Sequence, residues 1–398
     1  MITIEELRSA RRRVAPVLRP TPVDASHSLS ELAGRPVLLK PEHRQRTGSF
    51  KIRGAYNRIA QLAPGTAVVA ASAGNHAQGV ALAASLTGHP STIFMPANAS
   101  LPKADATRAY GATVRLEGEA VDDCIVAARA YADTTGAVYV PPFDDPDVIA
   151  GQGSLGLELA EEAPDAEVVV VPVGGGGLLA GVATALAHTR RSVRVVGVEA
   201  AGAPTLTAAL AAGRPVQLER MATMADGIAV GSTSALALAH AQAYVDQVVT
   251  VDEEEISRAM LVLIERAKAV VEPSGAAPLA AILAGRVPGA GPAVAVLSGG
   301  NIDPLLLTKL IEHGMSAAGR YLALRVVMPD RPGALAALAA ELARLGLNVL
   351  DVEHHRNGRH LGLAEVEVAV TVETRDTAQH QVVVAALATA GYKAEPLE

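Results

Sequence analysis

The chain has 398 residues, which is too long for one ordinary domain and indicates two or three. Half of the residues are hydrophobic, but there is no tryptophan and there are only three phenylalanines, so Ala, Val, Leu and Ile must fill the core. The formal net charge of −7 argues against nucleic acid or an anionic membrane as a partner. Cys124 is the single cysteine, which excludes an intrachain disulfide, and its Ala-rich helical surroundings predict a small buried residue.

The N-terminal segment predicts a folded helix, because Thr3 and Glu6 form the capping-box pattern and no signal-peptide core follows. The basic cluster at 11–13 is interpreted as a solvated face of that helix. Residues 168–187 are uncharged and long enough to suggest a membrane span, but Pro172 and four consecutive glycines favour a strand, a loop and a helix. We therefore expect a cytoplasmic protein without a membrane partner.

The first 310 residues alternate short apolar runs with Ala-rich helical runs. Apolar runs without polar alternation are typical of parallel strands covered on both faces. The expected strands are Ala67–Ala71, Ser91–Met95, Val168–Val173, Val193–Glu199 and Ala293–Leu297, and two of the expected helices are His76–Leu86 and Leu178–His188. This alternation predicts an open, doubly wound α/β architecture.

A second pattern begins near the C-terminus. A boundary is expected after Asn301, and the small and polar residues 313–320 are interpreted as a linker. The elements expected beyond it are strand Tyr321–Met328, helix Ala334–Leu345, strand Asn348–His354, strand Ala364–Glu373, helix Thr377–Ala390 and a last short strand. The order βαββαβ predicts a ferredoxin-like unit over residues 321–398.

The first motif with chemical meaning places Lys51 in a Gly- and Ser-rich, weakly charged stretch, Thr47 to Ala55. Schiff-base chemistry needs a lysine that can lose its proton, and burial lowers the pKa of a lysine. On spacing alone, a surface lysine in a loop remains the stronger interpretation.

A second motif, Ser72-Ala-Gly-Asn-His76, lies between an expected strand and an expected helix. Small residues at such a point let backbone N–H groups converge at a helix N-terminus, where a carboxylate binds well. An ordinary strand-to-helix turn with Asn75 as a cap explains the same residues equally well.

The third motif consists of four glycines that follow an expected strand and precede an expected helix. Their N–H groups can converge on one anion at the helix start, and a phosphate is the obvious candidate. The glycines are Gly174, Gly175, Gly176 and Gly177. The spacing Gly175-x-Gly177-x-x-Ala180, with Glu199 at the end of the next strand, also matches a dinucleotide fingerprint, which is the sharpest competing hypothesis.

The fourth motif is Leu297-Ser-Gly-Gly-Asn301. Ser298 follows a buried strand at its carboxyl end, where open α/β sheets hold ligands. A capping serine is the alternative interpretation.

Together the four motifs resemble the fold-type II pyridoxal-phosphate enzymes, in particular the group of threonine ammonia-lyases and serine racemases, over roughly residues 15 to 310. The resemblance implies a catalytic domain of two open parallel-sheet lobes in residues 1–312, with a smaller lobe at about 45–148 inserted in the larger. The dinucleotide hypothesis explains one motif of the four.

The resemblance also assigns roles. Lys51 matches the family lysine that carries the cofactor as a Schiff base and later moves the Cα proton of the substrate. Phe50 would pack beside the cofactor, Asn75 would hydrogen-bond the ring hydroxyl, residues 174–177 would hold the phosphate and Ser298 would face the pyridine nitrogen. The residues that would hold the substrate carboxylate are Ser72, Ala73, Gly74, Asn75 and His76.

Two departures from the family pattern bear on the reaction. In the serine racemases that this chain resembles, a second serine is expected at the position of Ala73. Alanine cannot transfer a proton, so elimination is favoured over racemisation. Relatives also bind a divalent cation through an acid matching Glu199, a carbonyl matching Ala203 and an Asp where this chain has Thr205. A monovalent or divalent cation site is therefore expected to be weak, and Glu199 can equally be a structural acid.

The C-terminal unit resembles an ACT domain, through Asp330-Arg-Pro-Gly333 and the junction before Asn348. The resemblance implies pairing through the sheets and binding of an amino-acid effector at Asp330, Pro332, Gly333 and Asn348, with a pure dimerisation module as the alternative. The pair His354-His355 is interpreted as a strand end because no third metal ligand is suitably spaced.

These expectations combine into one hypothesis. The chain is expected to convert L-threonine to 2-oxobutanoate and ammonia, and L-serine to pyruvate, as a homodimer or homotetramer. Another β-elimination on serine or 3-hydroxyaspartate, a serine racemase and a non-catalytic amino-acid sensor are the alternatives. The residues leave open whether the role is isoleucine biosynthesis or threonine catabolism.

Overall fold

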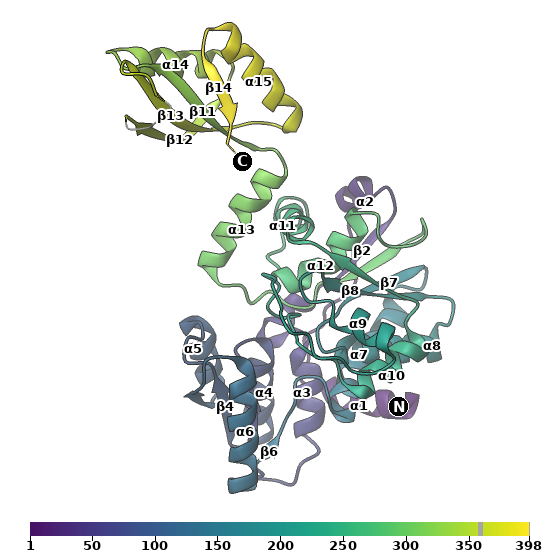
Figure 1. The fold of residues 1–398 in the computed structure, drawn as a ribbon. Helices are drawn as coiled ribbons and strands as arrows, with labels where there is room; N and C mark the ends of the chain where they lie inside the picture. The colour runs from purple at the N-terminus through teal and green to yellow at the C-terminus, as the bar shows by residue number, and fades with distance from the viewer. Residues whose placement is uncertain (357–360, 398) are drawn as a thin grey trace. The chain divides into compact units, whose positions relative to one another are not determined.

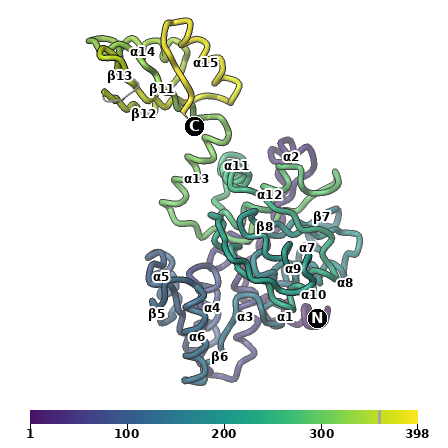
Figure 2. Tube along the Cα trace, viewed as in Figure 1, coloured from purple at the N-terminus to yellow at the C-terminus, as the bar shows by residue number. Residues whose placement is uncertain are grey.

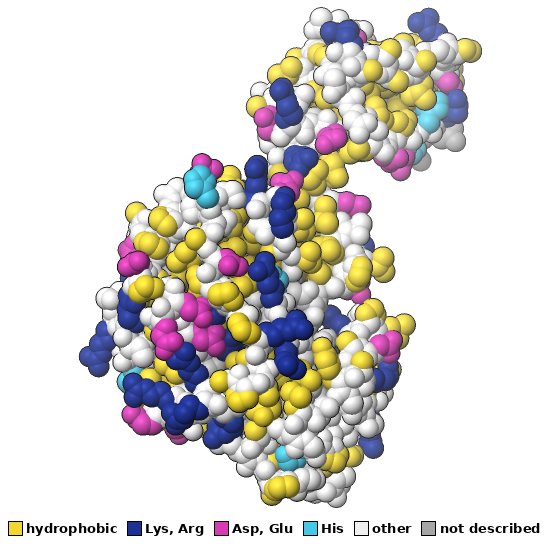
Figure 3. All heavy atoms as spheres, turned by 180° about the vertical axis from the view of Figure 1, so that it is seen from behind, with side chains coloured by type: hydrophobic (Ala, Val, Ile, Leu, Met, Phe, Trp, Pro, Cys, Tyr) yellow, Lys and Arg dark blue, Asp and Glu magenta, His cyan; other side chains and the backbone are white. Residues whose placement is uncertain are grey.

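The computed structural model describes residues 1–356 and 361–397, which form two compact units, Met1–Leu307 and Thr308–Glu398. Each unit is described by itself. Within the described residues, no helix is long and apolar enough to cross a bilayer. On the face drawn in Figure 3, basic and acidic side chains lie interspersed.

The larger lobe of the first unit is built on a six-stranded sheet in the order β1-β2-β10-β7-β8-β9. β1 pairs antiparallel with β2, and every other pair is parallel. The strands are β1 Asp24–Ala25, β2 Val37–Lys40, β7 Val168–Pro172, β8 Arg194–Ala200, β9 Gln247–Val251 and β10 Ala293–Val296. Valine and alanine fill the central strands, which are buried along their whole length, as expected for a sheet covered on both faces.

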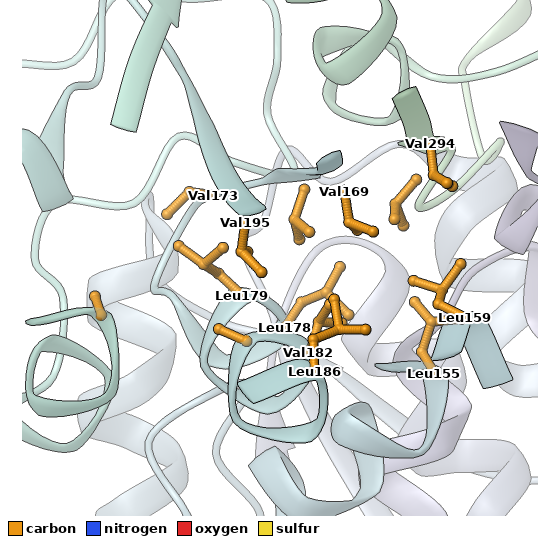
Figure 4. Packing of buried hydrophobic residues seen from close by; sticks show 14 of the residues in the cluster. Leu155, Leu159, Val169, Val173, Leu178, Leu179, Val182, Leu186, Val195 and Val294 are labelled. Carbon is orange, nitrogen blue, oxygen red and sulfur yellow. The ribbon is translucent and has the colours of Figure 1, made fainter. Parts of the chain in front are cut away.

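Helices and short turns surround this sheet. They are α1 Ile4–Val14, α2 His27–Ala33, η1 Glu42–Arg44, η2 Arg46–Gly48, α7 Pro146–Glu162, α8 Gly177–Thr189, α9 Thr205–Ala212, α10 Ala235–Tyr244, α11 Glu253–Val262, η3 Leu263–Ala267 and α12 Pro273–Leu283. Helix α1 begins with the predicted capping box of Thr3 and Glu6. Leucines of α7 and α8 pack against valines of β7, β8 and β10 in the core shown in Figure 4.

The smaller lobe comes from one contiguous stretch between β2 and β7, which Figure 2 shows in purple to blue. Its parallel sheet has the order β5-β4-β3-β6. The elements are α3 Lys51–Ile59, β3 Val68–Ala71, α4 Asn75–Thr87, β4 Ser91–Met95, α5 Leu101–Ala109, β5 Thr113–Leu116, α6 Val121–Thr135 and β6 Val138–Tyr139. Cys124 on α6 is fully buried and unpaired, as predicted.

The predicted doubly wound α/β class is confirmed, and most predicted element bounds differ by only one or two residues. The strand at Ser91–Met95 has its predicted bounds, and residues 168–187 form β7, a loop and most of α8. In the larger lobe the chain continues from β7 outward to β8 and β9, while β10 and β2 lie on the other side of β7. This topological switch places the carboxyl ends of β7 and β10 side by side, where such sheets hold ligands.

The second unit is an antiparallel sheet in the order β12-β13-β11-β14. Its elements are β11 Tyr321–Pro329, α14 Ala334–Arg344, β12 Asn348–His355, β13 Glu365–Glu373, α15 Thr377–Thr389 and β14 Lys393–Pro396. Buried and more exposed residues alternate along β11 and β13. The two helices pack against the face that carries the buried residues. The predicted βαββαβ unit is confirmed, and His355 ends β12 as expected.

The segment that joins the two units differs from its prediction. Residues 313–317 belong to helix α13, which spans Pro304–Ala317, so only residues 318–320 of the expected linker lie outside a helix. Gly314 and Met315 are buried, and this packing stabilises a helical turn that their composition alone does not predict. Gly319, at a φ of 67°, then lies in the turn that precedes β11.

Candidate active site

A cavity of about 420 Å³ lies between the two lobes of the first unit. The described residues that border it come from both lobes and include all four predicted motifs. The predicted site residues among them are Phe50, Lys51, Ser72, Ala73, Gly74, Asn75, His76, Gly174, Gly175, Gly176, Gly177 and Ser298. Motifs that lie far apart in the sequence therefore share one cavity.

Lys51 is the first residue of α3 and borders the cavity from the smaller lobe. Its Nζ donates a hydrogen bond to the carbonyl oxygen of Pro142 at 3.1 Å and lies 5.2 Å from the centre of the Phe50 ring. Burial lowers the pKa of Lys51 to about 8, and the carboxylate of Glu272 opposes part of this shift. A lysine with this pKa has a much larger neutral fraction near pH 7 than an exposed lysine, which suits a base or a nucleophile.

The backbone before Lys51 is fastened to the strand end that carries Ser298. The N–H of Phe50 donates to the carbonyl oxygen of Ser298 at 3.0 Å, and Ser49 and Gly299 form an isolated antiparallel bridge. Gly48, at a φ of 70°, has no space for a Cβ, which would lie 2.3 Å from the side-chain oxygen of Asn301. This close approach explains why a glycine precedes the Ser-Phe-Lys sequence.

The Ser72–His76 loop connects the carboxyl end of β3 to the start of α4. Ser72 Oγ accepts a hydrogen bond from the N–H of Gly74 at 3.1 Å, which stabilises the turn. The ring of His76 is buried, and its Nε2 donates to the carbonyl oxygen of Val140 at 2.9 Å. Burial, with a contribution from Lys51, lowers the pKa of His76 to about 3, so the ring is neutral. The ring thus anchors the loop to the segment after β6.

The glycine loop presents backbone to the cavity because protein packs closely against it. A Cβ on Gly175 would lie 2.2 Å from Cδ1 of the Phe143 ring, and one on Gly177 would lie 2.9 Å from Cβ of Phe143. Gly176 has a φ of 92°, and Thr233 Oγ1 donates to the carbonyl oxygen of Gly175 at 3.1 Å. The loop ends at the first turn of α8, whose leading N–H groups lack partners within the helix. Such a loop can hold a phosphate.

Two buried hydroxyl groups also border the cavity. Ser298 is 3% exposed, and Ser274, in the first turn of α12, is 2% exposed. The Oγ of Ser274 has no hydrogen-bond partner among the described residues. A buried hydroxyl without a partner is costly, and the position of Ser274 at the cavity makes its Oγ available to a bound group.

Glu272 is a residue of the site that the motifs did not reveal. It immediately precedes α12, is 4% exposed, and its Oε1 accepts a hydrogen bond from Asn75 Nδ2 at 2.7 Å. Burial and the nearby carboxylate of Asp226 raise the pKa of Glu272 to about 7. The signal in the sequence is that Glu272 is the only charged residue from Ala269 to Gly285 and directly precedes a proline.

Glu199 lies outside the cavity, and its geometry favours the structural interpretation. Its carboxylate accepts hydrogen bonds from the N–H groups of Leu206 and Thr207, at 2.6 and 3.0 Å, and from the Thr207 hydroxyl at 2.7 Å. The carboxylate therefore caps the start of α9. Among the described residues, no group of three or more His, Cys, Asp or Glu side chains is arranged to hold a metal ion. Ala203 is fully buried beside this cap.

The residues expected to bind an effector lie on the surface of the second unit. Gly333, with a φ of 90°, is the N-cap of α14, and no side chain caps that helix. Asp330 Oδ2 accepts a hydrogen bond from Arg356 Nε at 3.2 Å, while Pro332 and Asn348 are exposed. The uncapped helix start fits a carboxylate guest.

Comparison with known proteins agrees with this geometry. A family described as "Pyridoxal-phosphate dependent enzyme" matches residues 14–299, and one described as "ACT domain" matches residues 323–389. The chain belongs to the family of pyridoxal-phosphate-dependent enzymes. The predicted family is thus confirmed, and the dinucleotide alternative is set aside.

Several relatives of this pyridoxal-phosphate-dependent enzyme are named for reactions of threonine or serine. The L-threonine ammonia-lyase of Thermotoga maritima is 45% identical over 397 residues, which cover 99% of each chain. The solved processed form of threonine deaminase isoform 2 from Solanum lycopersicum is 36% identical, with a TM-score of 0.74, over 79% of this chain and 90% of that chain. Maize serine racemase is 34% identical, with a TM-score of 0.74, over 79% and 98%. The fold therefore serves both elimination and racemisation.

Proposed function

We propose that this protein is an L-threonine ammonia-lyase that also accepts L-serine, with pyridoxal phosphate at the cavity between the lobes. The observation that supports the proposal most directly is the position of Lys51, buried at the cavity wall and fastened through Phe50 to the strand end at Ser298. The full-length similarity to an enzyme named L-threonine ammonia-lyase supports the choice of substrate.

The cavity fits the cofactor in three respects. Lys51 is an amine with a lowered pKa, the loop Gly174–Gly177 presents backbone for a phosphate, and Ser274 has a buried hydroxyl without a described partner. Ser298 would face the pyridine nitrogen, Phe50 would pack beside the ring, and Asn75 would contact the ring hydroxyl. Pyridoxal phosphate, when bound, supplies a conjugated ring that stabilises negative charge developing at the substrate Cα.

The side chains of this chain then determine which reaction follows. Lys51 takes the proton from Cα, for which its lowered pKa is suited. The hydroxyl of Ser298 is neutral, so it does not hold a positive charge on the ring nitrogen as a carboxylate would. Weaker stabilisation of negative charge at Cα favours prompt loss of the β-hydroxyl. The Ser72–His76 loop would bind the substrate carboxylate through N–H groups at the start of α4, which no side chain caps.

The overall reaction releases one water molecule and later consumes one. L-threonine loses its Cα proton and β-hydroxyl as water, and the product is then hydrolysed, which consumes one water and yields 2-oxobutanoate and ammonia. The test is incubation of the purified holoenzyme with L-threonine and L-serine, with separate assays of ammonia and of each 2-oxo acid. Release of equal amounts of ammonia and 2-oxobutanoate is expected. Release of ammonia from L-serine but not from L-threonine would show that serine, and not threonine, is the substrate.

Serine racemisation is the second candidate, because a serine racemase has a comparable fold. Ala73 borders the cavity next to Ser72, and its methyl group cannot deliver a proton to the second face of Cα. This observation favours elimination.

The proposal also includes regulation and assembly. Binding of an amino-acid effector at the uncapped start of α14 is supported by the ACT-domain match and by the exposed positions of Asp330, Pro332 and Gly333. Asn348, the fourth residue expected to contribute, lies at the other end of the sheet, level with Tyr321. A homodimer or homotetramer is supported by the exposed edge strand β12, which carries exposed Val349, Leu350 and Val352. For the cation, binding near Glu199 and Ala203 stays a weaker proposal, because the Glu199 carboxylate already caps α9.

A further inference from the structure

The candidate site contains a chain of hydrogen-bonded side chains that none of the motifs predicts. Asn301 Nδ2 donates to the carbonyl oxygen of Thr47 at 2.6 Å and to Asn75 Oδ1 at 2.8 Å. Asn75 Nδ2 in turn donates to Glu272 Oε1 at 2.7 Å. The members come from the loop after β10, the start of α4 and the residue before α12, so the chain connects both lobes.

The direction of these hydrogen bonds follows from the chemistry of the two ends. The carbonyl of Thr47 can only accept, so Asn301 must direct its amide nitrogen toward it. That nitrogen then also donates to Asn75, which fixes the Asn75 oxygen toward Asn301 and the Asn75 nitrogen toward Glu272. The orientation of the Asn75 amide is therefore set by its neighbours on both sides. One of its two Nδ2 hydrogens serves Glu272, and no described residue engages the other.

We propose that Glu272 is a positioning residue, which holds the amide of Asn75 so that the uncommitted N–H is available to the ring oxygen of the cofactor. The inference rests on the proposed role of Asn75 toward the cofactor. Glu272 acts through Asn75, and Asn301 holds the same amide from its other end. A carboxylate suits this role because its oxygens only accept, and an acceptor with negative charge binds an N–H more strongly than a neutral one.

The surroundings of Glu272 indicate that its charge matters as well as its shape. A Cβ on Gly299 would lie 2.4 Å from Glu272 Oε1, so the backbone approaches the carboxylate closely. The charged groups that face Glu272 are Asp226, which raises its pKa, and Lys103 and Lys51, which lower it. With a pKa of about 7, the carboxylate gains its charge near neutrality, and the hydrogen bond to Asn75 then strengthens as the pH rises.

The test compares Glu272→Gln with the wild-type holoenzyme. Glutamine has nearly the same shape and keeps an acceptor oxygen, but it has no charge to gain. We expect the absorbance of the bound cofactor to titrate near neutral pH in the wild type and to become nearly independent of pH in the variant. We also expect the dissociation constant of the cofactor to rise roughly tenfold above pH 7, because a hydrogen bond to a neutral acceptor is weaker than one to a charged acceptor.

Further variants keep the test decisive. Asp122→Asn removes an exposed carboxylate that also borders the cavity, and it should leave the titration and the cofactor affinity unchanged. Asn301→Ala removes the other support of Asn75, and it should weaken cofactor binding in the same direction as Glu272→Gln. If Glu272→Gln does not fold, Glu272→Asp decides: it keeps the charge but withdraws the carboxylate from Asn75 Nδ2, so unchanged cofactor affinity there would overturn the proposal.

The outcome is separable from that of the proposed function. An unaltered titration and affinity in Glu272→Gln overturns the positioning role even if the enzyme deaminates threonine. Conversely, a lost titration supports the role of Glu272 even if the substrate is a different amino acid.

Discussion

Lys103 Nζ lies 2.9 Å from Asp226 Oδ2, and this ion pair joins helix α5 of the smaller lobe to the 220–233 segment of the larger lobe. Both residues border the active-site cavity. A second contact, from Ser100 Oγ to Asp303 Oδ2 at 3.0 Å, connects the same region of the smaller lobe to the larger lobe. The two lobes are therefore held together by polar contacts beside the cavity.

Loss of this ion pair is expected to weaken substrate binding more than turnover. The side chain of Asp226 is 59% exposed, so the pair contributes no more than about 1 kcal/mol. Lys103→Met should raise the KM for L-threonine by roughly two- to fivefold at low salt, with little change in kcat, and the difference should shrink as salt screens the pair in the wild type. Steady-state kinetics over a salt series provides the measurement.

The matched control is Arg108→Met. Arg108 lies on the same helix but pairs with Asp105 of that helix at 2.8 Å, so its loss leaves the contact between the lobes intact. An equal rise of KM in both variants would show that α5 itself, rather than the ion pair, is responsible.

Replacement of Lys51 is expected to abolish turnover while the protein still folds. No other lysine occupies the Ser-Phe-Lys context, and covalent catalysis then has no substitute amine. Borohydride reduction of the holoenzyme, followed by peptide mapping, should find the cofactor on Lys51 in the wild type. Capture of the cofactor by a different lysine would invalidate the assignment.

The same residue should destabilise the cofactor-free protein. The pKa of Lys51 is about 8 in the folded state, below the value of about 10.4 expected when unfolded. Between these values the unfolded state binds more protons, so the stability of the wild type rises with pH through this window, and the full cost is present below pH 8. Lys51→Met should therefore be more stable than the wild type near pH 7, by about 1–3 kcal/mol, with a smaller difference near pH 10. Urea unfolding at the two pH values measures it.

The position of Ala73 predicts the stereochemical outcome. The wild type should form little D-serine from L-serine, because a methyl group borders the cavity where a proton donor would be needed on the second face of Cα. Ala73→Ser should introduce measurable racemisation. Chiral chromatography of the serine pool distinguishes the cases, and rapid formation of D-serine by the unaltered enzyme would contradict the prediction.

The predictable part of the site lies at the ends of strands. Ser298 and Gly174 each follow a buried parallel strand by two residues, and β10 and β7 are hydrogen-bonded neighbours in the sheet. Apolar runs and glycines thus indicate both the strands and the edge at which their motifs meet. The bounds of β4, for example, follow from a short β-rich run, Ser91–Met95.

The part that could not be predicted depends on contacts between distant segments. Glu272 carries no motif, and only the fold shows that it contacts Asn75, which Asn301 holds from the other side. Similarly, Gly314 and Met315 look like part of a linker until burial stabilises the helix through them. The role of Phe143 behind the glycine loop is also a matter of packing, since its spacing from Gly175 has no local pattern.

The last prediction concerns regulation through residues 321–398. No side chain caps helix α14, whose N-cap is Gly333, so the N–H groups of its first turn can bind the carboxylate of an amino acid. Asp330, beside this helix start, accepts a hydrogen bond from Arg356, whereas Asn348 pairs with Glu373, level with Tyr321 at the other end of the sheet. Valine, isoleucine, threonine and serine are the amino acids to test.

Binding at this place changes activity only by the difference in affinity between two states, typically about 5- to 150-fold. Calorimetry of the full chain with each amino acid should therefore show binding for at least one, and the substrate curve should shift in its presence. Removal of residues after Arg320 should leave turnover intact and abolish the shift. Asp330→Ala, next to the α14 start, should weaken effector binding, whereas Asp133→Ala, the same change at an exposed position of the catalytic unit, should not. If calorimetry detects no binding of any of these amino acids and none alters the substrate curve, the C-terminal unit serves assembly alone.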